Sequence, residues 1–98
     1  MLLKVHSSYR LVVALCDSEL IGKKFEEGKK RLEITERFYK GDKYSEEKIL
    51  NLLYQYSRED ATFNIVGEKS VKAAIKSGII SEESVGRIKG IPHALTLL

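Results

Sequence analysis

The sequence lacks the features on which several classes of protein depend. It has one cysteine, Cys16, and no tryptophan in 98 residues. A lone cysteine forms no internal disulfide and supplies no Cys-x-x-Cys pair, which excludes a disulfide scaffold and a cysteine-rich zinc site. The longest apolar runs, such as residues 11–16, are far shorter than the roughly 20 residues needed to cross a bilayer. No secretory leader pattern opens the chain, so we expect a cytoplasmic protein without a membrane span.

Proline is equally scarce, with Pro92 as its only representative, and no repeat or low-complexity segment is present. The composition is 43% hydrophobic and 32% charged, against typical values of about 45–50% and 25%. This composition and length predict one globular domain over residues 1–98 with a strongly charged surface. Lys and Glu dominate the charges and heat-labile residues are few, which is typical of a protein from a thermophile.

Hydrophobic periodicity predicts an α+β fold. Alternating apolar residues predict strands over 2–6 and 9–16, a third strand near 31–35, and closing strands over 85–89 and 91–98. Helical spacing predicts helices over 45–58, with Ser45 as the cap, and over 67–77. Residues 61–66 fit either a strand or the lead-in to a helix. We therefore expect a mixed or antiparallel sheet of about four or five strands with two main helices packed on it.

The excess positive charge is concentrated in the first half of the chain. Residues 1–44 carry ten basic and seven acidic side chains, whereas residues 45–98 carry seven of each. The most basic segment is residues 22–31, which we interpret as a loop between glycines. Lysine and arginine side chains in such a loop can contact phosphates, although Glu26 and Glu27 also fit a solvated surface. The candidate residues are Lys23, Lys24, Lys29, Lys30 and Arg31.

A second candidate is the predicted helix start at Gly67, in the run Asn64-Ile-Val-Gly-Glu-Lys-Ser70. It lacks the first glycine and the Gly-Lys-Ser order of a nucleotide-hydrolysing phosphate loop. A helix start still offers free N–H groups, and with Lys69 it could bind one phosphate of a nucleic acid. The alternative is an ordinary cap made by Asn64 or Gly67.

Few residues could support catalysis or metal binding. His6, Cys16, Asp17 and His93 are not in ligand spacing, so the sequence predicts no metal site and no cofactor. Pairing of Cys16 with His93 would require the fold to bring them together. His93 is thus the one catalytic candidate, and a hydrogen-bonded core histidine is the alternative.

Three short motifs stand in order along the chain: Gly-Lys-Lys-Phe-Glu-Glu-Gly at 22–28, Asn-Ile-Val-Gly-Glu at 64–68 and Gly-Ile-Pro-His-Ala at 90–94. In these motifs, and over nearly its whole length, the sequence resembles the small archaeal proteins of domain-of-unknown-function family 424. The resemblance implies an archaeal, cytoplasmic, single-domain α+β protein and brings no activity. If the motifs meet in the fold, they would place four side chains in one polar patch: Lys23, Asn64, Glu68 and His93.

From these observations we expect a small accessory RNA-binding protein of archaeal translation or RNA processing, with RNA or the ribosome as its partner. It would contact phosphates through the basic loop 22–31 and the helix start at Gly67. One alternative is a non-enzymatic protein-interaction module or homodimer that uses a C-terminal strand over 91–98. A further alternative is a small enzyme using His93, although the sequence leans against catalysis.

Overall fold

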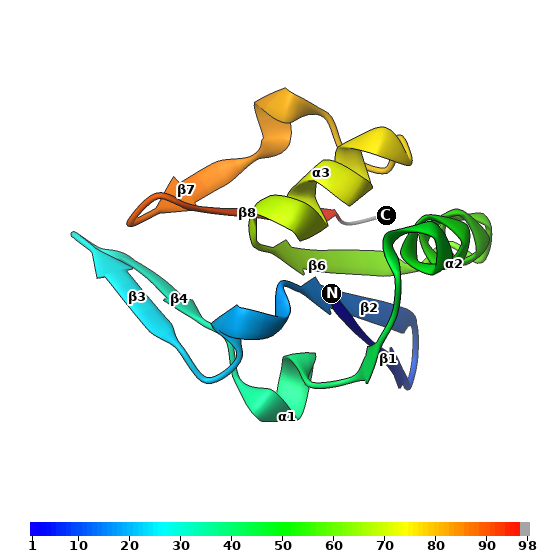
Figure 1. The fold of residues 1–98 in the computed structure, drawn as a ribbon, viewed down its shortest axis with the longest axis horizontal. Helices are drawn as coiled ribbons and strands as arrows, with labels where there is room; N and C mark the ends of the chain where they lie inside the picture. Colours follow the sequence, from blue (N-terminus) through cyan, green and yellow to red (C-terminus); the bar gives the residue numbers. More distant parts are fainter. Residues whose placement is uncertain (97–98) are drawn as a thin grey trace.

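A six-stranded mixed sheet forms the centre of residues 1–96, the part of the chain that the computed structural model describes (Figure 1). The strand order is β5-β1-β2-β6-β8-β7. The strands are β1 Leu2–Ser7, β2 Leu11–Cys16, β5 Asp42–Lys43, β6 Thr62–Val66, β7 Gly86–Ile88 and β8 Ile91–Thr96. β2 and β6 run parallel, and the other neighbouring pairs run antiparallel.

The predicted α+β domain is confirmed, but the predicted strand number is too low. Residues 61–66, which the sequence left open, contain the inner strand β6. Phe63 and Ile65 point to one face of the sheet, whereas Asn64 and Val66 point to the other. Both faces of this strand are largely buried, so its pattern lacks the clean polar alternation that would have identified it.

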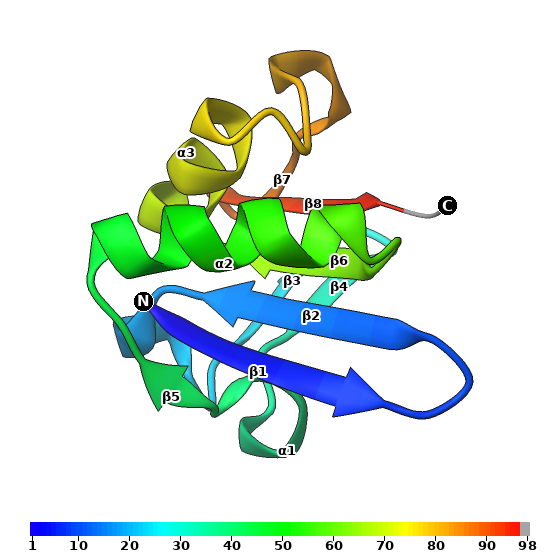
Figure 2. The ribbon, with the colours of Figure 1, turned by 90° about the vertical axis from the view of Figure 1, so that its right-hand side faces the viewer.

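Two helices cover one face of the sheet, with α2 lying in front of the strands in Figure 2. They are α2 Glu46–Arg58 and α3 Glu68–Lys76. The predicted cap of α2 is confirmed, because the Ser45 hydroxyl accepts the Lys48 N–H at 3.2 Å. Ile49 and Leu53 of this helix are fully buried against the sheet. No helix within residues 1–96 is long and apolar enough to span a membrane.

The opposite face of the sheet is covered by a β-hairpin and two short turns of helix. The hairpin consists of β3 Lys24–Glu27 and β4 Lys30–Glu33, and the turns are η1 Ser18–Leu20 and α1 Glu36–Tyr39. β3 and β4 pair antiparallel, with Phe25 opposite Leu32. These two side chains pack inward against a second apolar cluster that includes Cys16 and Val66.

Residues 22–31 are therefore mainly hairpin rather than the predicted loop. Each strand of the hairpin turns a single large apolar side chain toward the sheet, Phe25 in β3 and Leu32 in β4. The strand predicted near 31–35 is present as β4, whereas Phe25 alone among charged neighbours gives too little alternation to indicate β3.

The closing part of the chain contains the two strands predicted for it. A 3₁₀ turn, η2 Glu82–Ser84, leads into β7, which forms one edge of the sheet. β8 lies between β6 and β7, and His93 pairs with Val66 on one side and Gly86 on the other. The predicted C-terminal strand is thus present as β8, with residues 91–93 paired to β7 and not at an edge of the sheet, while Leu97 and Leu98 lie outside the described residues.

Candidate functional site

The first turn of α3 is capped by a carboxylate from a distant part of the sequence. Asp17 follows β2 and is only 4% exposed. Its carboxylate accepts the backbone N–H groups of Lys69 and Ser70 at 3.1 and 2.9 Å, and the Ser70 hydroxyl at 2.8 Å. Because β2 and β6 are parallel neighbours, the end of β2 lies beside the start of the helix that follows β6. A negative charge at this end of a helix is stabilising.

The Asp17 carboxylate is thus the side-chain cap of α3, and it occupies the position that was predicted for a phosphate. Neither Asn64 nor Gly67 provides a side-chain cap, since the Asp17 carboxylate takes the free N–H groups. Gly67 has φ of 111°, and a Cβ there would overlap the Asp17 carboxyl group. A phosphate at this helix start would have to displace a buried carboxylate. The helix start, including the Lys69 N–H, is therefore not a free anion site.

Two basic turns that are far apart in the sequence lie against each other. The tip of the β3–β4 hairpin meets the turn between β7 and β8, on the left side of Figure 1. Glu27 Oε1 accepts the Lys89 backbone N–H at 2.6 Å. Lys29, Lys30 and Lys89 are all exposed, and we refer to residues 27–30 and 87–90 as the joined turns.

Only some of the basic residues at this surface have acidic partners. Arg31 pairs with Glu26 and Glu33 at 3.3 and 3.2 Å, on the outer face of the hairpin. Arg87 pairs with Glu68 at 3.1 Å and also donates to the Gly90 carbonyl at 3.0 Å. Within residues 1–96, several lysines have no carboxylate at ion-pair distance: Lys23, Lys24, Lys29, Lys30 and Lys89.

Asn64 and His93 lie on the hairpin side of the sheet. Asn64 pairs with Leu95 and Val66 pairs with His93, so the two polar side chains are diagonal neighbours on adjacent strands. Both are half-buried. Burial, together with the nearby positive charge of Lys30, lowers the pKa of His93 below its usual value. Both effects favour the neutral form of the His93 ring.

The three motifs meet in the fold, but the four predicted polar residues do not form one patch. The first motif contacts the β7–β8 turn through Glu27, and Gly67 of the second donates its N–H to the Pro92 carbonyl of the third at 2.9 Å. Asn64 and His93 share a sheet face. Glu68 lies on the helix side with Arg87, and Lys23 precedes β3 at the base of the hairpin.

The thiol-imidazole pair considered for catalysis does not form. Cys16 is fully buried, and burial, reinforced by the Asp17 charge, raises its pKa to about 12. Cys16 pairs with Val66, which in turn pairs with His93, so the two side chains are two strands apart. That spacing is roughly 10 Å, beyond hydrogen-bond reach. Among residues 1–96 no group of three His, Cys, Asp or Glu could hold a metal ion.

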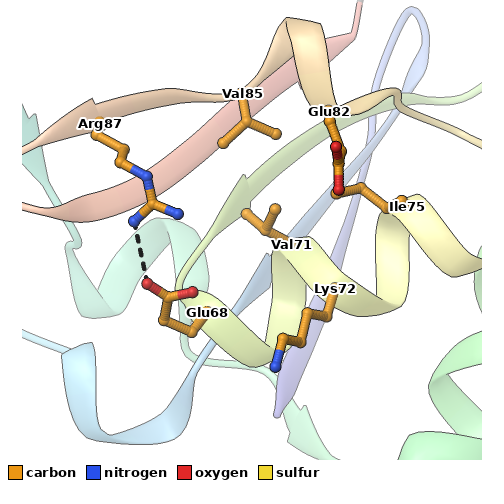
Figure 3. Close-up of a pocket in the computed structure, with 7 residues that line it drawn as sticks. All are labelled: Glu68, Val71, Lys72, Ile75, Glu82, Val85 and Arg87. Atoms are coloured by element: carbon orange, nitrogen blue, oxygen red, sulfur yellow. Dashed lines mark hydrogen bonds and ion pairs between the residues drawn. The ribbon is translucent and has the colours of Figure 1, made fainter.

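A groove lies on the helix side, between α3 and the segment that enters β7 (Figure 3). It measures about 280 Å³, and its floor is apolar, made by Val71, Ile75 and Val85. The Arg87–Glu68 ion pair closes one end, as the dashed line in Figure 3 shows. Acidic and basic side chains alternate along its rim, so the groove favours neither an anion nor a cation.

The sequence did not single out Asp17 as the cap of α3 or Lys89 as part of the basic surface. Asp17 was considered as a possible metal ligand, and its bond to residues 69 and 70 depends on the parallel pairing of β2 and β6. Lys89 lies in the half of the chain that has no excess charge, with Arg87 as its nearest basic neighbour, and so it gave no signal.

Comparisons with known proteins place this architecture in a family. No curated protein matches the sequence significantly. A solved structure described as an uncharacterized conserved protein from Methanopyrus kandleri is similar, with a TM-score of 0.87 and 26% identity. The match covers 97% of this chain and 88% of that one. The sequence model of a family described as "Protein of unknown function (DUF424)" matches residues 5–97. Because that match spans nearly the whole chain, the protein belongs to the DUF424 family.

Proposed function

We propose that this protein binds RNA phosphates through the joined turns. The observation that carries the proposal is the contact between Glu27 and the Lys89 N–H, which brings Lys29, Lys30 and Lys89 to one surface. Clustered lysines that lack acidic partners release counterions when they bind a polyanion. We take RNA as the polyanion, with a role in translation or RNA processing, because this was the expectation drawn from the basic segment 22–31.

Only some of the basic side chains of the hairpin contribute to the positive potential of this surface. The outer pair Glu26 and Arg31 is neutralised across the strands, so Arg31 contributes little positive potential. Lys30 is on the inner side, opposite Glu27 in register. The potential is therefore concentrated at the hairpin tip and the adjacent turn, with Lys23 and Lys24 as a second basic position at the hairpin base.

The test is a salt series of RNA-binding measurements by fluorescence anisotropy. The test variant is Lys29→Gln with Lys30→Gln and Lys89→Gln. The matched control is Lys43→Gln with Lys48→Gln and Lys72→Gln, which removes the same charge from exposed lysines elsewhere. We expect the test variant to bind all RNA sequences more weakly. The slope of log affinity against log salt should decrease by up to about 2, because each lost contact to a single strand removes about 0.7.

The control variant should retain most of the affinity and the salt slope. Equal losses in the two variants would mean that binding depends only on net charge and not on the joined turns. No binding by the wild-type protein at low salt would reject RNA binding itself.

A further inference from the structure

The sheet face beside the joined turns is only partly covered. Along β8, Ile91 packs beneath the hairpin, His93 lies near Lys30 where that cover ends, and Leu95 is 56% exposed. Along β6, Val66 is likewise buried, whereas Asn64 is half-buried. Past the hairpin, the face thus presents polar and apolar groups side by side.

Asn64 and His93 retain unused hydrogen-bonding capacity on this face. Neither side chain forms a hydrogen bond to another protein group within residues 1–96. An amide has two donors and an acceptor, and a neutral imidazole has one donor and one acceptor. Among residues 1–96 the buried polar side-chain atom without a partner is Ser18 Oγ, so the polar atoms of Asn64 and His93 are not sealed in the core and can reach a ligand.

The position of the His93 ring depends on the absence of a side chain at residue 86. His93 pairs with Gly86, and a Cβ on Gly86 would approach the Cε1 and Nε2 atoms of the ring to 3.0 Å. The ring therefore lies over the Gly86 backbone. One of its edges is held against β7 in this arrangement.

From this arrangement we propose that the protein reads a base of single-stranded RNA on this face, with Asn64 bonding the base edge, His93 contacting the base and Lys30 the adjoining phosphate. This inference rests on the proposed RNA binding and names its substrate class. A side-chain amide can form two hydrogen bonds to one base edge, as in asparagine–adenine pairs. Exposed Leu95 supplies apolar surface beside them.

The chemistry favours a single strand over a duplex. In a duplex the bases are stacked and paired, and side chains cannot enter the deep, narrow major groove of RNA. An unpaired base can leave the stack and lie flat on a sheet face, where its edge reaches groups such as Asn64. The joined turns alone would bind both forms through phosphates.

The experiment compares binding of homopolymeric single strands of adenine, cytosine, guanine or uracil, and of an RNA duplex, at one low salt concentration. The variant Asn64→Leu keeps the side-chain size and removes the amide. Its matched control is Asn51→Leu, on the exposed side of α2. We expect the wild type to prefer one homopolymer, and Asn64→Leu to reduce that preference by roughly tenfold while its salt slope stays unchanged. Asn51→Leu should leave both unchanged.

A second measurement does not depend on the folding of a variant. Nucleoside 5′-monophosphates added to the wild-type protein should shift the NMR signals of the Asn64 amide and the His93 ring, and leave those of Asn51 in place. Equal wild-type affinity for all homopolymers and the duplex, or an unchanged preference in Asn64→Leu, would overturn this inference alone. A wild-type protein that binds no RNA would overturn the proposed function as well.

Discussion

Asp17 connects the first half of the chain to the second. Its buried carboxylate satisfies two N–H groups and one hydroxyl of the first turn of α3. The carboxylate also fills the place where Gly67 has no side chain. This arrangement joins the end of β2 to a helix more than 50 residues later, as the sequence separation of 53 between Asp17 and Ser70 shows.

Replacing Asp17 by Asn should lower the free energy of unfolding by about 1–3 kcal/mol. The amide loses the charge that favours the helix N-terminus, and its NH₂ group cannot accept the Lys69 N–H. Urea unfolding followed by circular dichroism measures the change. Glu19→Gln is the control, because Glu19 is exposed nearby and should change little. A stability equal to wild type in Asp17→Asn would contradict the role of this cap.

His93 should make the unliganded protein less stable as the pH falls. Its pKa is lowered in the folded state, first by burial and second by Lys30, from an ordinary value of 6.5. The unfolded chain therefore takes up this proton more readily, so folding loses free energy as the pH decreases through 6.5 toward the folded pKa. Above 6.5 both states are neutral at this position, and no such loss occurs.

The measurement is urea unfolding at about pH 7.5 and about pH 5.5, on either side of the ordinary histidine pKa. Wild type should lose more stability between these values than His93→Gln, in which His6 and the acidic residues are still present and cancel in the comparison. An equal loss in both proteins would show that His93 is not the group responsible.

At the scale of elements, the β3–β4 hairpin is attached to the sheet at two points. Phe25 and Leu32 pack into the second apolar cluster, and Glu27 at the tip bonds the Lys89 N–H. The outer face carries only charged residues. A two-stranded hairpin is marginally stable alone, so these contacts should determine how firmly the basic tip is held.

Phe25→Ala should loosen the hairpin and lower the free energy of unfolding by about 1–3 kcal/mol, less than for a fully buried phenylalanine because Phe25 is half-buried. Hydrogen exchange of the β3 and β4 amides should accelerate more than that of β6 amides. Lys24→Ala, one position away on the outer face, should leave exchange and stability nearly unchanged. Equal acceleration in β6 would mean that the hairpin does not open separately from the sheet.

At the scale of the whole molecule, one sheet is shared by two apolar clusters. The larger cluster lies under α2 and α3, and the smaller lies under the hairpin, η1 and α1. β2 contributes to both, with Val13 and Leu15 on one side and Ala14 and Cys16 on the other. Because the same strands form both clusters, neither can be lost without exposing the sheet.

The Cys16 thiol provides a direct test of this coupling. It is fully buried, with its pKa raised to about 12, so folded protein should not react with a thiol reagent such as 5,5′-dithiobis(2-nitrobenzoate). Labelling in increasing urea should follow the same transition as circular dichroism. Rapid labelling of the wild-type protein, in which Phe25 still holds the hairpin, would show that Cys16 becomes accessible without unfolding of the sheet.

Contacts between residues close in the sequence could be predicted, whereas contacts between distant residues could not. Ser45 was correctly identified as a cap, because its bond to the Lys48 N–H spans only three residues and so depends on the local sequence alone. The partner of Asp17 was not identified, since the contact requires β2 and β6 to be neighbours. The basic segment 22–31 was identified, but the strand that contains Phe25 was not. Asn64 and His93 were predicted to share a patch with Lys23 and Glu68, and of these four residues Asn64 and His93 share a face of the sheet.

The sequence by itself determined the α+β class, the two main helices and the location of the excess charge, because composition and short-range periodicity specify these properties. Only the tertiary structure decided that β8 is an inner strand, that the start of α3 is occupied by Asp17, and that Lys89 stands beside the hairpin tip. Each of these contacts joins residues far apart in the chain. Strand order, which no local pattern encodes, selects which of them meet.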